Sequence, residues 1–99
     1  MALEIKWTKR ADQKFDKVID YLLTEWGDQT TKTFVKKVYD FLDLLTFYPE
    51  IGSIENEEKE IRGFPVTQQI IIFYRVSNTT IIILDFFDNR QSKSRKRFK

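Results

Sequence analysis

Two near-continuous apolar runs, Ile70–Tyr74 and Ile81–Leu84, constrain the fold of this chain more than any other feature. Runs of isoleucine and aromatic residues of this length are typical of strands that lie centrally in a sheet or are covered on both faces. Between the runs, Ser77, Asn78 and Thr79 supply turn-forming side chains. The sequence therefore predicts two strands joined by a tight turn.

The N-terminal half has the patterns of one strand and two helices. Residues 3–7 alternate between apolar and polar, as in a strand with one buried face. Thr8 is placed to cap a following helix that Gly27 ends, and Asp28 is placed to cap a second helix. The aromatics Phe15, Trp26, Phe34 and Phe41 are expected in the core or between the helices. They belong to a larger set of apolar residues at helical spacing, which are Ala11, Phe15, Val18, Ile19, Leu22, Leu23 and Trp26, then Phe34, Val35, Val38, Phe41, Leu42 and Leu45.

The rest of the chain has the pattern of a sheet. Pro49 and Gly52 end the helical unit, and the acidic residues Glu55–Glu58 indicate a loop. We expect strands at about residues 59–64, 67–76 and 80–87. The order strand, helix, helix, strand, strand, strand predicts an α+β fold, in which an antiparallel two-helix hairpin packs on one face of a mainly antiparallel sheet. At 99 residues, we expect one domain, 1–99.

Composition excludes several kinds of chemistry. The chain has no cysteine and no histidine, so disulfides, thiolate or imidazole catalysis and metal sites built on those side chains are excluded. No apolar run approaches the roughly 20 residues of a membrane span, and the N-terminus lacks the pattern of a secretory signal.

A metal site built on the two aspartates of the last strand is not expected. Asp85 and Asp88 have an odd spacing, which puts them on opposite faces of a regular strand. We expect a cytoplasmic protein with no metal, no cofactor and no membrane partner.

Charge is distributed unevenly along the chain. Residues 90–99 carry six Lys or Arg and no acid, whereas the remaining residues carry eleven basic and fifteen acidic side chains. This basic tail can attract a phosphate backbone or an acidic protein. A solvated chain end is the alternative interpretation. The cationic side chains are Arg90, Lys93, Arg95, Lys96, Arg97 and Lys99.

Several short segments follow one another in a characteristic order. They are an opening strand with Trp7, a helix ending Glu25-Trp26-Gly27, a second helix closed by Tyr48-Pro49, then Ile61-Arg62, Phe73-Tyr74-Arg75-Val76 and a strand ending Asp88-Asn89-Arg90. In order and spacing, over nearly the whole chain, these segments resemble the RelE/ParE superfamily of small bacterial toxins. The resemblance implies the α+β fold given above. It also implies a growth-arresting toxin of a type II toxin-antitoxin module, neutralised by a cognate antitoxin.

The resemblance leaves two target classes. RelE-like members cut mRNA in the ribosome, whereas ParE-like members bind DNA gyrase and trap it on broken DNA. Metal-free RNA cleavage needs an acid-base pair and cations that stabilise the charged phosphorane. If the chain is a nuclease, the candidate catalytic cations are Lys59, Arg62 and Arg90, with Glu60 or a tail lysine as the general base.

The resemblance is closer to the ParE-like branch. In the nuclease branch an arginine commonly lies three residues before the tyrosine of the third strand, where this chain has Ile71. A Tyr or His usually closes the nuclease site near the C-terminus, where this chain has Phe86, Phe87 and Asp88. The favoured prediction is a non-enzymatic gyrase poison. The alternatives are an mRNA endonuclease and a degenerate toxin that only binds antitoxin.

Partner-binding residues are expected on the sheet and in the tail. Arg62 can contact a partner or form an ion pair with the nearby residues Glu57–Glu60. Tyr74 is expected in the core, which puts Arg75 on the opposite face of its strand. The candidates for antitoxin or target binding are Arg62, Arg75, Phe87, Arg90, Lys93, Arg95 and Lys96.

The two phenylalanines at the end of the last strand are expected to differ. One of Phe86 and Phe87 belongs in the core, and the other is expected to be exposed to a partner. The expected partners are a cognate antitoxin and DNA gyrase, or the ribosome and mRNA in the alternative. Operator DNA is expected to bind only through the antitoxin complex.

Overall fold

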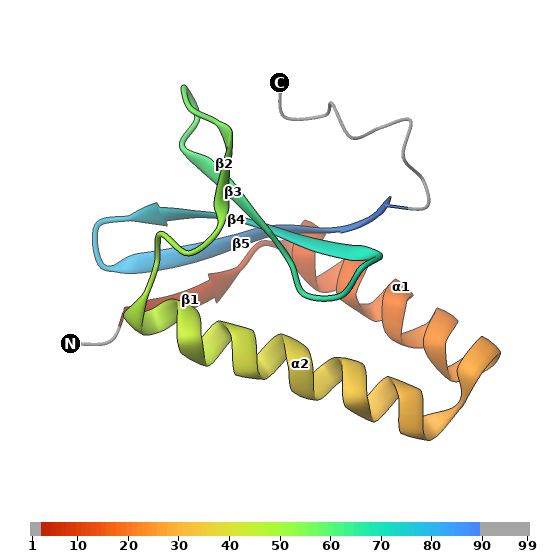
Figure 1. The fold of residues 1–99 in the computed structure, drawn as a ribbon. Helices are drawn as coiled ribbons and strands as arrows, with labels where there is room; N and C mark the ends of the chain where they lie inside the picture. Colours follow the sequence, from red (N-terminus) through yellow and green to blue (C-terminus); the bar gives the residue numbers. More distant parts are fainter. Residues whose placement is uncertain (1–2, 90–99) are drawn as a thin grey trace.

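Five strands form one mixed sheet, and two helices pack against one of its faces (Figure 1). The computed structural model describes residues 3–89 of the chain. In the sheet the strand order is β1-β5-β4-β3-β2. The predicted α+β class, with a helix hairpin on one face of the sheet, is confirmed. The elements in chain order are β1 (Glu4–Trp7), α1 (Lys9–Trp26), α2 (Asp28–Phe47), β2 (Ser53–Asn56), β3 (Ile61–Pro65), β4 (Ile70–Ser77) and β5 (Thr80–Asp88).

The helix hairpin begins after Thr8, which caps α1, and turns at Gly27, which separates α1 from α2. The Thr8 hydroxyl accepts a hydrogen bond from the Ala11 N–H at 3.0 Å, which confirms the predicted N-cap of α1. Gly27 ends α1 with a φ of 89°, a conformation that costs little without a Cβ. The prediction that Asp28 caps α2 is wrong, because Gly27 is the N-cap and Asp28 is the first helical residue. Its carboxylate there still suits the positive end of the helix dipole.

The β4–β5 hairpin lies at the centre of the sheet, as the apolar runs predict. The strands pair antiparallel through a two-residue turn between Ser77 and Thr80, in which Asn78 takes a positive φ of 54°. β1 lies parallel to β5, and β3 pairs antiparallel with the other side of β4. Both inner strands are therefore hydrogen-bonded on two sides, which explains their continuous apolar sequence.

The strand β2 is missing from the sequence prediction, which has a loop there. Its four residues are exposed or half-buried, so they carry neither an apolar run nor a clear alternation. Backbone pairing with β3, at Ser53↔Gly63 and Ile54↔Arg62, makes the segment a strand. The two edges of the sheet are therefore β1 and β2.

Most of the core lies between the helices and the sheet. The rings of Trp7, Phe15 and Phe86 pack together where β1, α1 and β5 meet, with centroids 5.1 to 5.3 Å apart. Aromatic contacts of this kind add to the burial of apolar surface. Trp7 and Phe15 are partly buried, whereas the large fully buried side chains of this cluster are Val38, Leu45, Ile72, Tyr74, Ile81, Ile83 and Phe86.

A second, smaller apolar cluster lies on the other face of the sheet. Phe73 alternates with the core residues Ile72 and Tyr74, so it points away from the helices. It packs against Phe87, with ring centroids 6.1 Å apart. The prediction that one of Phe86 and Phe87 is exposed is therefore wrong, because each is buried on its own face of the sheet.

The turn of the helix hairpin extends beyond the sheet (Figure 1). Trp26, the last residue of α1, is 64% exposed there. The prediction that Trp26 packs in the core or between the helices is wrong, since most of its side chain is exposed and it lines the rim of a groove. Among residues 3–89, no helix is long and apolar enough to cross a membrane.

Candidate functional site

A groove of about 900 Å³ runs between α1, α2 and the loop that joins β3 to β4. Its apolar lining includes Phe34 and Phe86, and Lys14, Lys17 and Lys37 also line it. We call this surface the lysine groove. Its lining residues are Lys14, Lys17, Val18, Tyr21, Leu22, Trp26, Gln29, Thr30, Thr33, Phe34, Lys37, Thr67, Gln69, Ile70, Phe86 and Asp88.

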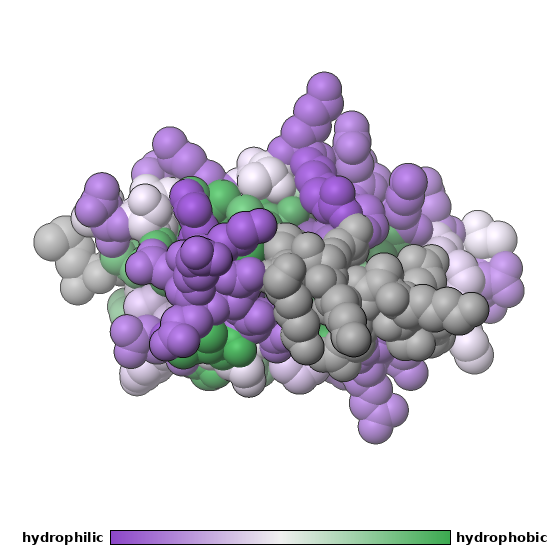
Figure 2. Space-filling view, turned by 90° about the horizontal axis from the view of Figure 1, so that it is seen from above, coloured by the Kyte–Doolittle hydropathy of each residue, from purple (hydrophilic) through white to green (hydrophobic). Residues whose placement is uncertain are grey.

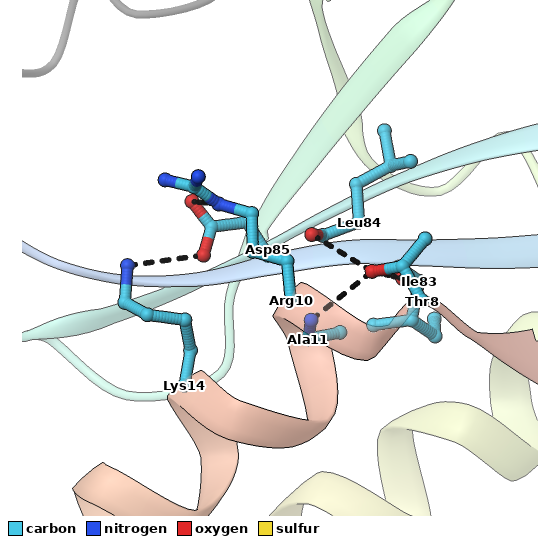
Figure 3. Close-up of polar contacts among 7 residues, drawn as sticks. All are labelled: Thr8, Arg10, Ala11, Lys14, Ile83, Leu84 and Asp85. Carbon is cyan, nitrogen blue, oxygen red and sulfur yellow. Dashed lines mark hydrogen bonds and ion pairs between the residues drawn. The ribbon is translucent and has the colours of Figure 1, made fainter.

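A buried carboxylate ties the first turns of α1 to the sheet (Figure 3). Asp85 of β5 has no exposed surface, and it accepts a hydrogen bond from Lys14 Nζ at 3.1 Å. Its other oxygen lies 3.5 Å from Arg10 Nε. Beside this pair, Thr8 Oγ1 lies 3.1 and 3.2 Å from two carbonyl oxygens of β5. These contacts position α1, and with it the Lys14 side chain at the groove.

A β-bulge in β5 alters the faces of its last residues. The pairing passes from Phe73↔Asp85 to Tyr74↔Ile83, so one residue of β5 has no partner and strict alternation is lost. Pairing is regular again from Asp85 to Asp88, so Asp85 shares the face of Phe73 and Asp88 shares the face of Ile70. Asp88 lines the lysine groove, and Lys14 of α1 reaches Asp85. The prediction that these aspartates lie on opposite faces is therefore confirmed. Within residues 3–89, no group of three or more acidic side chains is arranged to hold a metal ion.

Two side chains of the sheet hold the loop that follows α2. The Tyr74 hydroxyl donates to the Pro49 carbonyl at 2.8 Å and accepts from the Gly52 N–H at 2.9 Å. The Arg62 guanidinium donates to the carbonyls of Glu50 and Gly52 at 3.1 and 2.8 Å. A Cβ on residue 52 would lie 2.8 Å from the Tyr74 hydroxyl oxygen, so this close approach requires glycine.

Tyr74 is a core residue, as predicted, and its side chain is fully buried. Burial raises its pKa above the usual value, because desolvation disfavours the phenolate; the hydrogen bond from Gly52 and the positive charge of Arg62 act in the opposite direction. The hydroxyl is therefore neutral at physiological pH. Its hydrogen bonds are made within the protein, and it is not available to a substrate.

Arg62 holds the loop that follows α2, and its predicted ion pair with Glu57–Glu60 is not formed, while its predicted contact with a partner stays a prediction. In the described part of the chain it forms no ion pair with Glu57–Glu60 or with any other carboxylate. A cavity of about 370 Å³ lies beside it, and three carboxylates and one guanidinium line this cavity, giving it a net negative charge. We call it the glutamate pocket. Its lining residues are Pro49, Glu50, Ile54, Glu57, Glu60, Arg62 and Val76.

Of the other predicted site residues within residues 3–89, Glu60 lines the glutamate pocket with Arg62, whereas Lys59 and Arg75 do not. Lys59 is exposed in the β2–β3 turn, where its backbone N–H donates to Asn56 Oδ1. Glu60 ends that turn with a positive φ of 59°. Arg75 is exposed on the face of β4 opposite Tyr74, as predicted. The predicted residues that lie outside residues 3–89 are Arg90, Lys93, Arg95 and Lys96.

An exposed apolar patch extends from the end of α2 to β2. Phe47, Tyr48 and Ile54 are 66%, 63% and 56% exposed, and Ile51 is exposed as well. We call these four residues the 47–54 patch. Seen from above, hydrophilic atoms cover the projecting β2–β3 hairpin, and hydrophobic atoms show beside it (Figure 2). Sequence reasoning missed the patch, although apolar residues that fall outside the helical stripe of α2 were a signal for it.

A comparison with models of protein families identifies the family of this chain, and the result agrees with the fold described above. The family model for the ParE toxin of the type II toxin-antitoxin system parDE matches residues 5–92. The chain belongs to the ParE toxin family. This ParE family member is the toxin component of a type II toxin-antitoxin system, as the sequence resemblance predicts. The comparison with curated proteins found no match.

Solved structures share the fold of this ParE family member. The chromosomal ParDE TA system from P. aeruginosa has a TM-score of 0.72 and 18% identity, over 88% of this chain and 96% of that one. The YoeB/ParE toxin from Agrobacterium tumefaciens has a TM-score of 0.61 and 12% identity, over 87% and 98%. The E. coli DinJ-YafQ toxin-antitoxin complex has a TM-score of 0.62 and 10% identity, over 92% and 97%. These similarities establish the fold and leave the molecular target open.

Proposed function

We propose that this toxin arrests growth by binding DNA gyrase and not by cleaving mRNA. The observation that carries the proposal is the environment of Arg62, the predicted catalytic cation that lies on a strand. Its guanidinium already donates to two loop carbonyls, and three glutamates line the cavity beside it. A phosphate group that approached this cavity would meet a net negative charge, which disfavours its binding.

The groups that could transfer protons support the same proposal. Tyr74 is buried and hydrogen-bonded to the loop. Ile71 and Phe87, at positions where the nuclease branch has polar groups, are buried in the second apolar cluster. A binding toxin needs no acid-base pair; it needs exposed surfaces that complement its partners. The lysine groove and the 47–54 patch are such surfaces.

The lysine groove is our proposed site for the antitoxin. Apolar lining residues beside three lysines suit an amphipathic segment with acidic side chains at its edges. The ParDE system and the DinJ-YafQ complex are described as a toxin-antitoxin system and a toxin-antitoxin complex. On this proposal the antitoxin complex, in the cytoplasm, is the form that binds operator DNA.

The target is tested with purified toxin, DNA gyrase and translating ribosomes. We expect the toxin to increase the amount of plasmid DNA that gyrase leaves cleaved, and to leave ribosome-bound mRNA intact. Toxin mixed beforehand with an excess of antitoxin is the control, and it should be inactive. Cleaved mRNA together with intact plasmid would refute the gyrase proposal in favour of the nuclease.

The antitoxin site is tested by reversing charge at the groove. The variant Lys17→Glu/Lys37→Glu should bind antitoxin at least about tenfold more weakly, a loss of about 1.4 kcal/mol. The control Lys9→Glu/Lys32→Glu has the same net charge and the same helices, but neither residue lines the groove. Calorimetric titration measures both variants. Equal losses of affinity in the two would mean that the antitoxin responds to overall charge and not to the groove.

A further inference from the structure

The 47–54 patch is separate from the proposed antitoxin site. The lysine groove is lined by the first half of α2, up to Lys37, whereas the patch begins at Phe47, the last residue of that helix. Ten residues of α-helix span about 15 Å. The two surfaces are therefore at opposite ends of α2, and a ligand in the groove does not by itself cover the patch.

Apolar area in the patch is concentrated and rigidly held. Its four large side chains fall within eight consecutive residues, and the hydrogen bonds of Tyr74 and Arg62 fix the loop between them. Exposed apolar side chains that gather in one place commonly mark a site of protein association. Because the loop is already ordered in the free toxin, little conformational entropy of the loop is lost when a partner binds.

The charge beside the patch defines the chemistry of the partner. In the glutamate pocket, Ile54, Pro49 and Val76 supply apolar surface, and Glu50, Glu57 and Glu60 supply carboxylates. The C-terminal end of α2 lies next to it with no basic residue in its last turn, so the negative end of the helix dipole adds to the field. An aliphatic stem with a cationic end, as in Lys or Arg, matches both parts of this pocket.

We infer that the 47–54 patch and the glutamate pocket together bind a protein segment in which Lys or Arg stands beside apolar residues. The cationic side chain enters the pocket with its stem on Ile54 and Val76, and the neighbouring apolar residues cover Phe47 and Tyr48. This inference deepens the proposed function, because it makes this surface the one that engages the gyrase target. Among the predicted basic residues within residues 3–89, Arg62 lines the pocket, where three carboxylates outweigh its charge, and Lys59 and Arg75 do not line it.

Two double variants test the surface against a matched control. Ile54→Ser/Glu57→Lys changes one exposed apolar side chain and one carboxylate of the pocket. Leu23→Ser/Glu58→Lys changes an exposed apolar side chain of α1 and the adjacent carboxylate of the same turn, and neither residue lines the pocket. The net charge is the same in both. Thermal unfolding shows that each variant folds, and antitoxin affinity shows that the groove is intact.

The first readout is binding to gyrase. We expect Ile54→Ser/Glu57→Lys to bind at least about tenfold more weakly than the wild type, and Leu23→Ser/Glu58→Lys to bind like the wild type. The wild-type affinity should also fall with added salt, as expected for a contact between opposite charges. Equal gyrase binding by the two double variants would overturn the inference while leaving the gyrase proposal intact.

The second readout needs no gyrase. A synthetic pentapeptide of alternating lysine and valine is titrated into isotope-labelled wild-type toxin, with an alternating glutamate and valine peptide as the control. We expect the basic peptide alone to shift the amide signals of Ile51, Ile54 and Val76, and the Ile54→Ser/Glu57→Lys variant to lose the shifts. If gyrase binding is absent but these shifts are present, the proposed target is wrong and the inferred surface stands.

Other outcomes would overturn the inference. Shifts confined to the lysine groove, or equal shifts with both peptides, would show that the pocket does not select a cationic side chain. A second copy of this chain is the competing occupant, since residues 90–99 carry six basic side chains. Concentration-dependent self-association of the wild type, lost in Ile54→Ser/Glu57→Lys, would replace the partner protein with that second copy.

Discussion

Two buried polar side chains join segments that are far apart in the sequence. The Tyr74 hydroxyl connects β4 to the loop after α2, and the Asp85 carboxylate connects β5 to α1. A buried polar group that loses its partner costs about 1–3 kcal/mol, more than a hydrogen bond contributes on average. Both residues therefore have a larger effect on stability than their few contacts indicate.

Replacing Tyr74 by Phe is expected to lower the free energy of unfolding by about 1–3 kcal/mol, because the Gly52 N–H loses its acceptor and the Pro49 carbonyl loses its donor. Urea unfolding followed by tryptophan fluorescence measures the change. Tyr39→Phe is the matched control, since Tyr39 is exposed on α2 and should tolerate the change. Equal stability of the two variants would contradict the role assigned to the buried hydroxyl.

The same variant changes the dependence of stability on alkaline pH. The pKa of Tyr74 is raised in the folded protein, above the value of about 10 for an unfolded chain. Its contribution to stability is therefore complete below the unfolded-state pKa and is lost as pH rises through the folded-state pKa. From about pH 9 to pH 11, the urea midpoint of the wild type should fall more steeply than that of Tyr74→Phe. Parallel curves would show that other groups dominate.

Asp85→Asn is expected to lower the free energy of unfolding by about 1–3 kcal/mol, because Lys14 loses its charged partner and the buried site gains an amide group. Asp40→Asn is the matched control. Asp40 pairs with Lys36 on the exposed face of α2, and that change should have no measurable effect. Chemical unfolding at neutral pH compares them. A control variant as unstable as Asp85→Asn would argue against any special effect of burial.

For single residues, the sequence predicts correctly those whose contacts are close to them in the chain. Thr8 and Gly27 act through the backbone next to them, and the core position of Tyr74 follows from strand alternation. The predictions that failed concern residues whose contacts are far away in the sequence. Arg62 binds a loop that precedes it by ten residues or more, and the burial of Phe87 depends on its packing against Phe73 of the neighbouring strand.

Among the elements, α1 depends most on its attachment to the sheet. The hydroxyl of Thr8 caps the helix and also reaches the carbonyls of β5. Thr8→Ala should therefore lower the free energy of unfolding by about 1–2 kcal/mol. Thr33→Ala removes a hydroxyl that bonds only to its own helix and should change stability much less. Thermal and urea unfolding measure both variants; equal losses would mean that the N-cap adds nothing beyond helix propensity.

The helices and inner strands were predictable from periodicity, whereas β2 was not. A segment that is exposed on both faces has no apolar pattern, and its strand conformation comes from pairing with β3. The same limit applies to the candidate site. The lysine groove and the glutamate pocket each combine residues from three or more segments, so the residue types were visible in the sequence while their proximity was not.

The strand order sets the stability of the molecule as a whole. β4 and β5 are hydrogen-bonded on both sides, whereas β2 pairs only with β3. Backbone amides that need global unfolding to open exchange most slowly with solvent. In hydrogen exchange, the amides of Ile72 and Ile83 should therefore be slower than the unpaired amides of β2 by a factor of about 100 or more. Similar rates across the sheet would indicate that it opens as one unit.

The parallel pairing of β1 with β5 joins the first strand of the molecule to the last one. The N-cap of α1 and the Lys14 ion pair also depend on β5. During synthesis on a ribosome, β1, α1 and α2 therefore emerge well before the strand that completes their packing. A toxin with this topology completes the lysine groove only after β5 has emerged, so an antitoxin already present in the cell can meet it as it folds.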